Sequence, residues 1–342
     1  MIAIVGATGV LGTQLISALG RADHPVEELT LFASEKSVGT EVDVGGETLE
    51  VEPIEFRGID VALFATPLAA SRPLIDAALK VGTRVIDFSG AFRSDRSVPH
   101  GVPGLTAFPS DARVAGVAGA AGLTLSRALA PLHRAARVAW ADVTALHGAG
   151  HRGRAGVEAL EKQTAGLLSG RHPDSPEPFA QTAAFNVLPH VGAFAKAHPQ
   201  SSEELATALD FARAVEAAPP APPLRGAPNP APFAPLTAPP VRVTALHVPV
   251  FHGLVLSVSL QLEGPLDVEA VRAALKGSSR VKVLDAPDEG IYPTALLTAD
   301  DEAVHVGRIR VAGNHVWFVA AADAAALVAS AGLELLTIWQ GE

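Results

Sequence analysis

The first twenty residues, MIAIVGATGVLGTQLISALG (1–20), combine a short apolar run, a glycine-rich turn and an amphipathic segment. Residues 2–5 are long enough for one buried parallel strand, and residues 14–19 predict a helix after it. Glycines between a strand and a helix let the backbone approach a phosphate, which the free amides at the helix start would bind. We therefore predict a dinucleotide site, with an ordinary strand–helix turn as the alternative. Its predicted cofactor-binding residues are Gly6, Thr8, Gly9, Val10, Leu11 and Gly12.

The second predicted strand, residues 29–32, bears on which dinucleotide would bind. In an NAD site an acidic residue at the end of this strand takes the ribose 2′-hydroxyl. Here Ser34 and Lys36 follow the strand and suit a 2′-phosphate better, although Glu35 between them weakens the inference. NADP is the predicted cofactor, and a solvated loop without a binding role is the alternative.

Composition sets the class of protein. The chain has 342 residues, 48% of them hydrophobic, which is enough for two domains that each bury a hydrophobic core. Its net charge of −10 disfavours nucleic acid or an anionic membrane as partner. No apolar run is long enough to span a bilayer, and the N-terminus lacks the basic start of a signal peptide, so a cytoplasmic location is expected. The absence of cysteine excludes disulfides, thiolate metal sites and thiol nucleophiles.

Strands alternate with helices up to about residue 90, which indicates an α/β fold with a Rossmann-type, doubly wound parallel sheet. A second, α+β domain is predicted over residues 126–322, and the first domain is predicted to span residues 1–125, closed by a C-terminal helix at 323–342. Residues 217–240 hold ten prolines and are expected to form an extended surface insertion.

Several stretches, in the same order and over nearly the whole chain, resemble the aspartate-semialdehyde dehydrogenase family. They are residues 6–12, 32–34, 86–93, 128–132, 153–158, 184–191, 248–251 and 292–294. The resemblance implies a dinucleotide-binding domain, a second domain that carries the contacts of a homodimer, and NADP as cofactor. It also implies a cysteine nucleophile, a histidine that moves protons and an arginine that holds the substrate.

The positions that match the family's reacting residues hold other side chains here. The cysteine position falls on Ala120 or Ala121, and the substrate arginine falls on His247. The proton-transferring histidine falls on Leu254, and a family glutamine falls on His147. The chain is in this respect similar to the family's Usg-type paralogues, which share the fold.

Arg93 matches the family's phosphate-binding arginine and is expected to hold phosphate or another small anionic ligand. If the family geometry holds, His147 and His247 face one pocket. The two histidines could form a metal site or a new acid–base pair, and partly buried polar side chains with satisfied hydrogen bonds are the alternative. No acidic residue stands at an obvious third-ligand position, and the residues near His147 read as strand and turn, so the four-residue spacing of His147 and His151 does not indicate a shared helix face. No metal is therefore predicted.

Three hypotheses follow from these residues. The first is a catalytically degenerate homologue that binds NADP and has no catalytic residue at the four replaced positions. The second is an active NADP-dependent oxidoreductase on another aldehyde or ketone, with His147 or His247 as proton donor. The third is an interaction protein that works through the proline-rich insertion.

Overall fold

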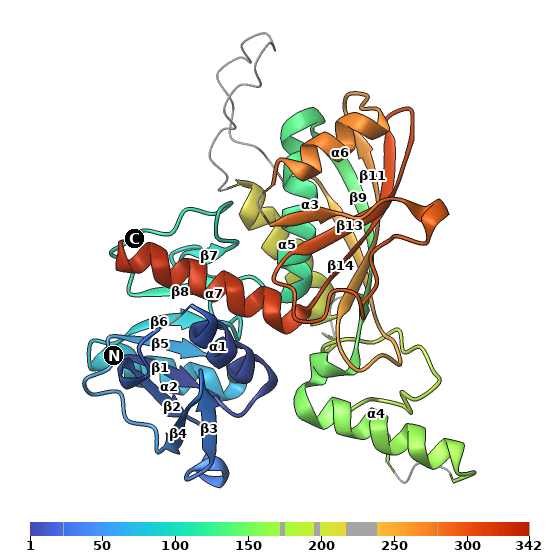
Figure 1. Cartoon of the computed structure of the whole chain (residues 1–342). Helices are drawn as coiled ribbons and strands as arrows, with labels where there is room; N and C mark the ends of the chain where they lie inside the picture. The colour runs from blue at the N-terminus through green and yellow to red at the C-terminus, as the bar shows by residue number, and fades with distance from the viewer. Residues whose placement is uncertain (23, 172–174, 195–198, 217–237, 279, 342) are drawn as a thin grey trace.

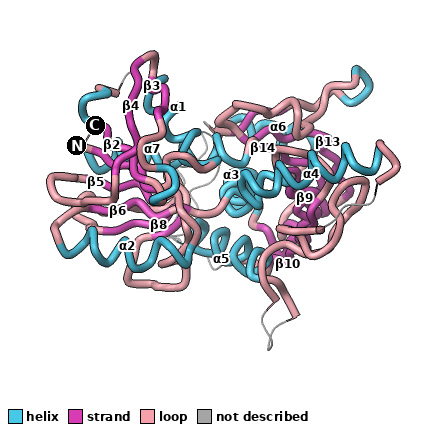
Figure 2. The backbone as a smooth tube through the Cα atoms, turned by 90° about the horizontal axis from the view of Figure 1, so that it is seen from below, coloured by secondary structure: helices cyan, strands magenta, loops and turns pink. Residues whose placement is uncertain are grey.

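The structure is a computed structural model that describes all residues except 23, 172–174, 195–198, 217–237, 279 and 342. Its described part contains one eight-stranded and one six-stranded sheet, each in its own domain. Figure 2 shows the two sheets on opposite sides of helices α3 (Ala120–Ala136) and α5 (Ser202–Glu216). The predicted α/β fold with a second α+β domain is confirmed.

The first sheet has the strand order β3-β4-β2-β1-β5-β6-β8-β7 and is parallel apart from the β3–β4 hairpin. Its strands are β1 (Ile2–Val5), β2 (Leu29–Phe32), β3 (Glu41–Val44), β4 (Glu47–Glu52), β5 (Val61–Phe64), β6 (Arg84–Asp87), β7 (His100–Gly101) and β8 (Val114–Val117). β1 pairs with β2 on one side and β5 on the other, so the chain reverses its winding direction beside β1. Ligands of open parallel sheets bind at such a switch point.

Helices cover both faces of this sheet. α1 (Val10–Arg21) packs against α7 (Ala324–Gln340) on one face, and α2 (Leu68–Lys80) buries Ile75 and Ala78 against the other. Figure 1 shows α7, in red, lying along the first domain although it ends the chain. The helix that ends the described chain therefore packs on the elements of the first domain.

The second sheet has the order β10-β9-β11-β14-β13-β12. Its strands are β9 (Val138–His147), β10 (Val241–His247), β11 (Leu254–Leu262), β12 (Val281–Val283), β13 (Val304–Ala312) and β14 (His315–Ala322). α3 packs on its inner face together with α6 (Val268–Lys276), while α4 (Gly153–Leu168) projects away from it (Figure 1). α3 also runs through the domain boundary predicted at residue 125, so that boundary falls inside one helix.

Two further predictions depend on what the structure describes. Most of the proline-rich insertion, residues 217–237, lies outside the described residues. Within the described residues, every helix is too short or too polar to cross a lipid bilayer.

Candidate functional site

A cleft of about 630 Å³ opens where the first sheet reverses its winding and the second domain meets it. The glycine turn lines one side, with Gly9, Val10 and Leu11. Ala120 at the start of α3 and His147 at the end of β9 line the other side. The cleft thus joins the predicted cofactor loop to the positions of the predicted reaction centre.

The glycine turn has the backbone geometry that a phosphate site needs. Gly6 has φ +95°, and a Cβ on Gly12 would lie 2.1 Å from the Gly6 carbonyl oxygen, so both positions require glycine. Gly9 caps α1 without any side-chain hydrogen bond, which leaves the first amides of the helix directed at the cleft. These features fit a dinucleotide pyrophosphate.

The predicted 2′-phosphate residues lie beside this turn. Ser34 and Lys36 are exposed where the chain leaves β2, in and just before a short 3-10 turn. Thr8 Oγ1 lies 3.4 Å from Ser37 Oγ in the same 3-10 turn. Arg154 of the second domain donates a 2.9 Å hydrogen bond to the Thr8 carbonyl. The glycine turn is therefore tied both to the second strand and to the other domain.

Three of the four replaced positions form one row across the second sheet. His147 pairs with His247 on the parallel strand β10 and with Leu254 on the antiparallel strand β11. Neighbours in a register row point to the same face of a sheet, and all three side chains are buried on the inner face. The rings of His147 and His247 lie near each other, with centres 6.3 Å apart, and of the two only His147 lines the cleft.

The fourth replaced position also lies at the cleft. Ala120 is the first residue of α3 and lines the cleft, whereas Ala121 is 1% exposed and packs in the core. Of the two alanines compatible with the nucleophile position, only Ala120 faces the cleft.

Asp210 of α5 holds the start of α3 in place. Its carboxylate accepts 2.8 Å hydrogen bonds from the Gly119 amide and from Arg93 Nε, and His100 Nε2 also lies 2.8 Å away. Burial raises the pKa of Asp210, but Arg93 and His100 outweigh it and hold that pKa below its ordinary value. The charge of Arg93 is therefore already compensated by a buried carboxylate.

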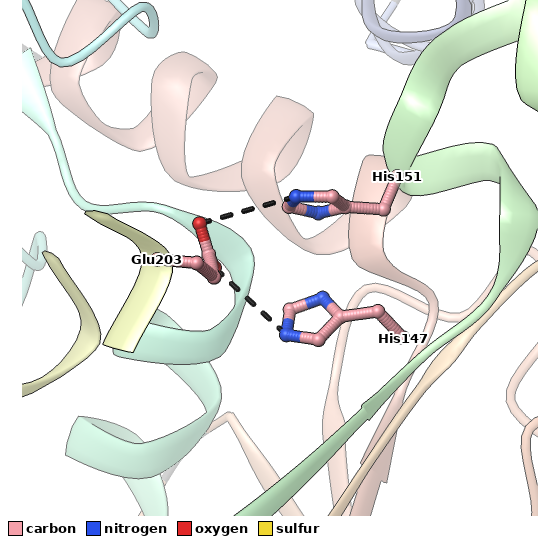
Figure 3. A group of neighbouring side chains, drawn as sticks. All are labelled: His147, His151 and Glu203. Atoms are coloured by element: carbon pink, nitrogen blue, oxygen red, sulfur yellow. Dashed lines mark ion pairs between the residues drawn. The ribbon is translucent and has the colours of Figure 1, made fainter. Parts of the chain in front are cut away.

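Glu203 is a site residue that sequence reasoning missed. It lies near the start of α5, and its carboxylate oxygens are 3.9 Å from His147 Nε2 and 3.9 Å from His151 Nε2 (Figure 3). A 3-10 turn over Ala149–Arg152 brings His151 back toward His147, with ring centres 4.5 Å apart. Glu203 and His151 are far apart in sequence, so no spacing pattern could have linked them.

Burial controls the protonation of this cluster. Desolvation lowers the pKa of His147 well below its ordinary value, and His151 and His247 lower it further. Desolvation also lowers the pKa values of His151 and His247 to about 4 each. It raises the pKa of Glu203 to about 7, against the attraction of Arg93. The imidazoles are thus neutral at pH 7, and each can offer a nitrogen lone pair.

Comparisons with known proteins agree with this arrangement. Residues 1–109 match the family model for the semialdehyde dehydrogenase NAD-binding domain, and residues 129–324 match the one for its dimerisation domain. A USG-1 protein homolog of Azotobacter vinelandii is 33% identical over 322 residues, covering 90% of this chain and 87% of that protein.

Two further relatives are named aspartate-semialdehyde dehydrogenase or probable aspartate-semialdehyde dehydrogenase. An aspartate-semialdehyde dehydrogenase of Aquifex aeolicus is 28% identical over 93% of this chain and 92% of its own. The solved structure of a probable aspartate-semialdehyde dehydrogenase from Pseudomonas aeruginosa superposes with a TM-score of 0.85 at 29% identity, covering 100% of this chain and 99% of that one. The chain belongs to the semialdehyde dehydrogenase family, with an NAD-binding domain followed by the family's dimerisation domain.

Proposed function

We propose that this protein binds NADP in the cleft but lacks the covalent thiol chemistry of aspartate-semialdehyde dehydrogenases. One observation carries the proposal. Ala120 is the residue at the start of α3 that faces the cleft, and the sequence contains no cysteine that could replace the missing nucleophile. A thiolate both forms and releases an acyl-enzyme readily, and a methyl group can do neither.

Nearby hydroxyl groups do not replace the thiol. Thr124 lies one turn further along α3, is fully buried and donates its hydroxyl to the Ala120 carbonyl. Ser126 is also fully buried in the same helix. Neither hydroxyl is among the groups that line the cleft.

The partner positions support the same conclusion. Leu254 has no proton to transfer, and it sits beside His147 in the row where the family resemblance implies the acid–base histidine. His247 replaces the implied substrate arginine, and its lowered pKa leaves it neutral at pH 7. A neutral imidazole cannot form the charged, two-pronged contact that arginine makes with a carboxylate.

The test is the family reaction itself. The protein is mixed with aspartate semialdehyde, phosphate and NADP, and NADPH is followed by absorbance, with the Aquifex aeolicus relative as positive control. We expect no turnover above a protein-free blank. Robust NADPH formation by this protein would refute the proposal.

A second candidate function is direct hydride transfer to or from another aldehyde or ketone, with NADP as the partner. It is favoured by the position of His147, which lines the cleft beside the carboxylate of Glu203 and needs no covalent intermediate to move a proton. This function predicts an NADPH-linked activity in a carbonyl screen that His147→Ala or His247→Ala abolishes. A blank screen with protein that binds NADP would count against it.

We further propose that the protein is a homodimer formed through the outer face of the second sheet. The match to a dimerisation domain supports this assembly. Trp140 of β9 and Trp317 of β14 are half-buried on that face, which the described helices leave uncovered. Trp317→Glu should shift the mass measured by light scattering from two chains to one, and an unchanged mass would exclude this face as the interface.

A further inference from the structure

The group of His147, His151 and Glu203 has no role in the proposed loss of thiol chemistry. Its three side chains come from β9, from the 3-10 turn after it and from α5, and they point at one another (Figure 3). One ligand atom of each lies within 4.8 Å of the other two. A strand, the turn that follows it and a helix about fifty residues further along the chain thus direct donor atoms toward one small volume.

Direct hydrogen bonds do not account for this convergence. Glu203 is 3.9 Å from each ring nitrogen, beyond hydrogen-bond distance. His147 Nε2 is buried and has no hydrogen-bond partner among the described residues. A buried polar atom without a partner destabilises the fold. A bound ligand that accepts the lone pair of this nitrogen would remove that cost.

We propose that His147, His151 and Glu203 together bind one divalent transition-metal ion, of the kind represented by zinc. Two imidazoles and one carboxylate form the donor set of zinc sites that keep a position open, and also of non-haem iron sites. Magnesium and calcium prefer oxygen ligands and suit this set poorly.

The geometry needs only a small adjustment. Zinc bonds of about 2.1 Å place tetrahedral ligand atoms about 3.4 Å apart. Ligand atoms within 4.8 Å of one another reach that spacing when each moves by less than about 1 Å, which is within side-chain reach. The His151 side chain is 30% exposed, which gives the ion a path from solvent.

Neighbouring charges allow a cation here. Arg93 is the positive charge that acts on Glu203, and Asp210 compensates it through a 2.8 Å ion pair. Arg152 is the positive charge that acts on His151, and it donates a hydrogen bond to the Pro178 carbonyl. The His247 ring stands beside the group, its centre 5.6 Å from that of His151. An ion bound by His147 and His151, which both line the cleft, would face the space beside Ala120.

The experiment measures metal binding without any dehydrogenase substrate, so its failure is separate from a failure of the proposed function. Full-length protein without a polyhistidine tag is stripped with a chelator and titrated with zinc against a chromophoric competitor. We expect one zinc ion per chain. Glu203→Gln and His151→Ala should each weaken zinc binding by more than the roughly 100-fold that loss of an outer-shell partner costs.

The control is His315→Ala, at the far end of β14 from this row, which should bind zinc as the parent does. Circular dichroism establishes that each variant is folded. Cobalt substitution supplies an independent readout, because its visible bands report nitrogen and oxygen ligation and should vanish in Glu203→Gln. Absence of stoichiometric zinc binding, equal affinity in Glu203→Gln, or equal competition by magnesium would each overturn the proposal.

Discussion

The glycine turn and the histidine row stand on opposite sides of one cleft, and they differ in what supplies their chemistry. At the turn, Gly6, Gly9 and Gly12 leave backbone amides facing the cleft, and side chains contribute little. In the row of His147, His247 and Leu254, side chains would bind and react with the substrate. The family resemblance implies an arginine at His247 and a histidine at Leu254.

Backbone sites and side-chain sites respond differently to substitution. The glycine turn is also part of the fold, because the Gly12 position is filled by the Gly6 carbonyl and no larger residue fits. A row at the end of a sheet can exchange side chains while the strands stay paired, because the pairing uses backbone groups. The proposed function requires this difference, since it keeps the nucleotide cleft and changes the reaction centre.

The largest expected effect is on the network that holds the start of α3 rather than on the histidine row. Asp210→Ala leaves His100 buried and Arg93 half-buried without their carboxylate and frees the Gly119 amide. Breaking a buried pair costs about 3–5 kcal/mol of unfolding free energy. Urea unfolding should show this loss, whereas Asp142→Ala, which removes an exposed ion pair with Arg242, should cost at most about 1 kcal/mol. Equal losses would show that the Asp210 network does not support the fold.

The same carboxylate gives a pH dependence. The pKa of Asp210 is lower in the folded protein than its unfolded value of about 3.9, so its stabilisation is complete above about pH 4 and is lost as the pH falls through the folded pKa. Asp210→Asn cannot titrate, and its unfolding free energy should fall less between pH 4 and pH 2.5 than that of the parent. Parallel pH profiles would contradict this assignment.

Gly12→Ala is expected to lower both the stability of the glycine turn and its affinity for NADP. The new methyl group would meet the Gly6 carbonyl oxygen at 2.1 Å, and overpacking of this kind costs about 1–3 kcal/mol. Thermal unfolding and NADP titration should both show the loss. Gly264→Ala places its methyl in open space and serves as the matched control. Unchanged nucleotide binding in Gly12→Ala would remove the turn from the cofactor site.

Ala120→Cys and Ala121→Cys test which of the two positions is accessible from the cleft, because each variant carries a single cysteine. The thiol at 120 faces the cleft at a helix N-terminus, which favours the thiolate, and the thiol at 121 is buried. Alkylation by iodoacetamide, followed by mass spectrometry, should be at least about tenfold faster at position 120. Equal rates would mean that Ala120 does not face accessible space.

The smallest expected effect concerns the choice of dinucleotide. Lys36 is exposed, so its contact with a 2′-phosphate is worth at most about 1 kcal/mol, a few-fold in affinity. Lys36→Ala should weaken NADP and leave NAD unchanged in parallel titrations, with Lys80→Ala at the end of α2 as control. An equal change for both dinucleotides would exclude a role in selectivity.

Continuous apolar runs made the first domain predictable. The predicted strands over residues 2–5 and 29–32 match β1 and β2 to the residue, because buried parallel strands are apolar throughout. The β3–β4 hairpin was missed, since its strands are mostly exposed and carry four glutamates, Glu41, Glu47, Glu50 and Glu52. β13 and β14 near the end of the second domain were missed as well.

The site was only partly predictable. The resemblance predicted that His147 and His247 face one pocket; the strand register places them side by side, and His147 lines the cleft. The expectation that no acidic residue accompanies these histidines was wrong, because α5 packs beside the second sheet and brings Glu203 to them. Such contacts arise from tertiary packing, which local sequence patterns do not encode.

The central claim is that the cleft still binds NADP although its reaction centre differs from that of the family. Calorimetric titration of NADP into the purified protein tests this binding most directly. Binding near micromolar, about −8 kcal/mol, is the predicted result, with NAD binding more weakly. The absence of any binding heat at several temperatures for both dinucleotides would contradict it, and would leave the glycine turn as a structural element alone.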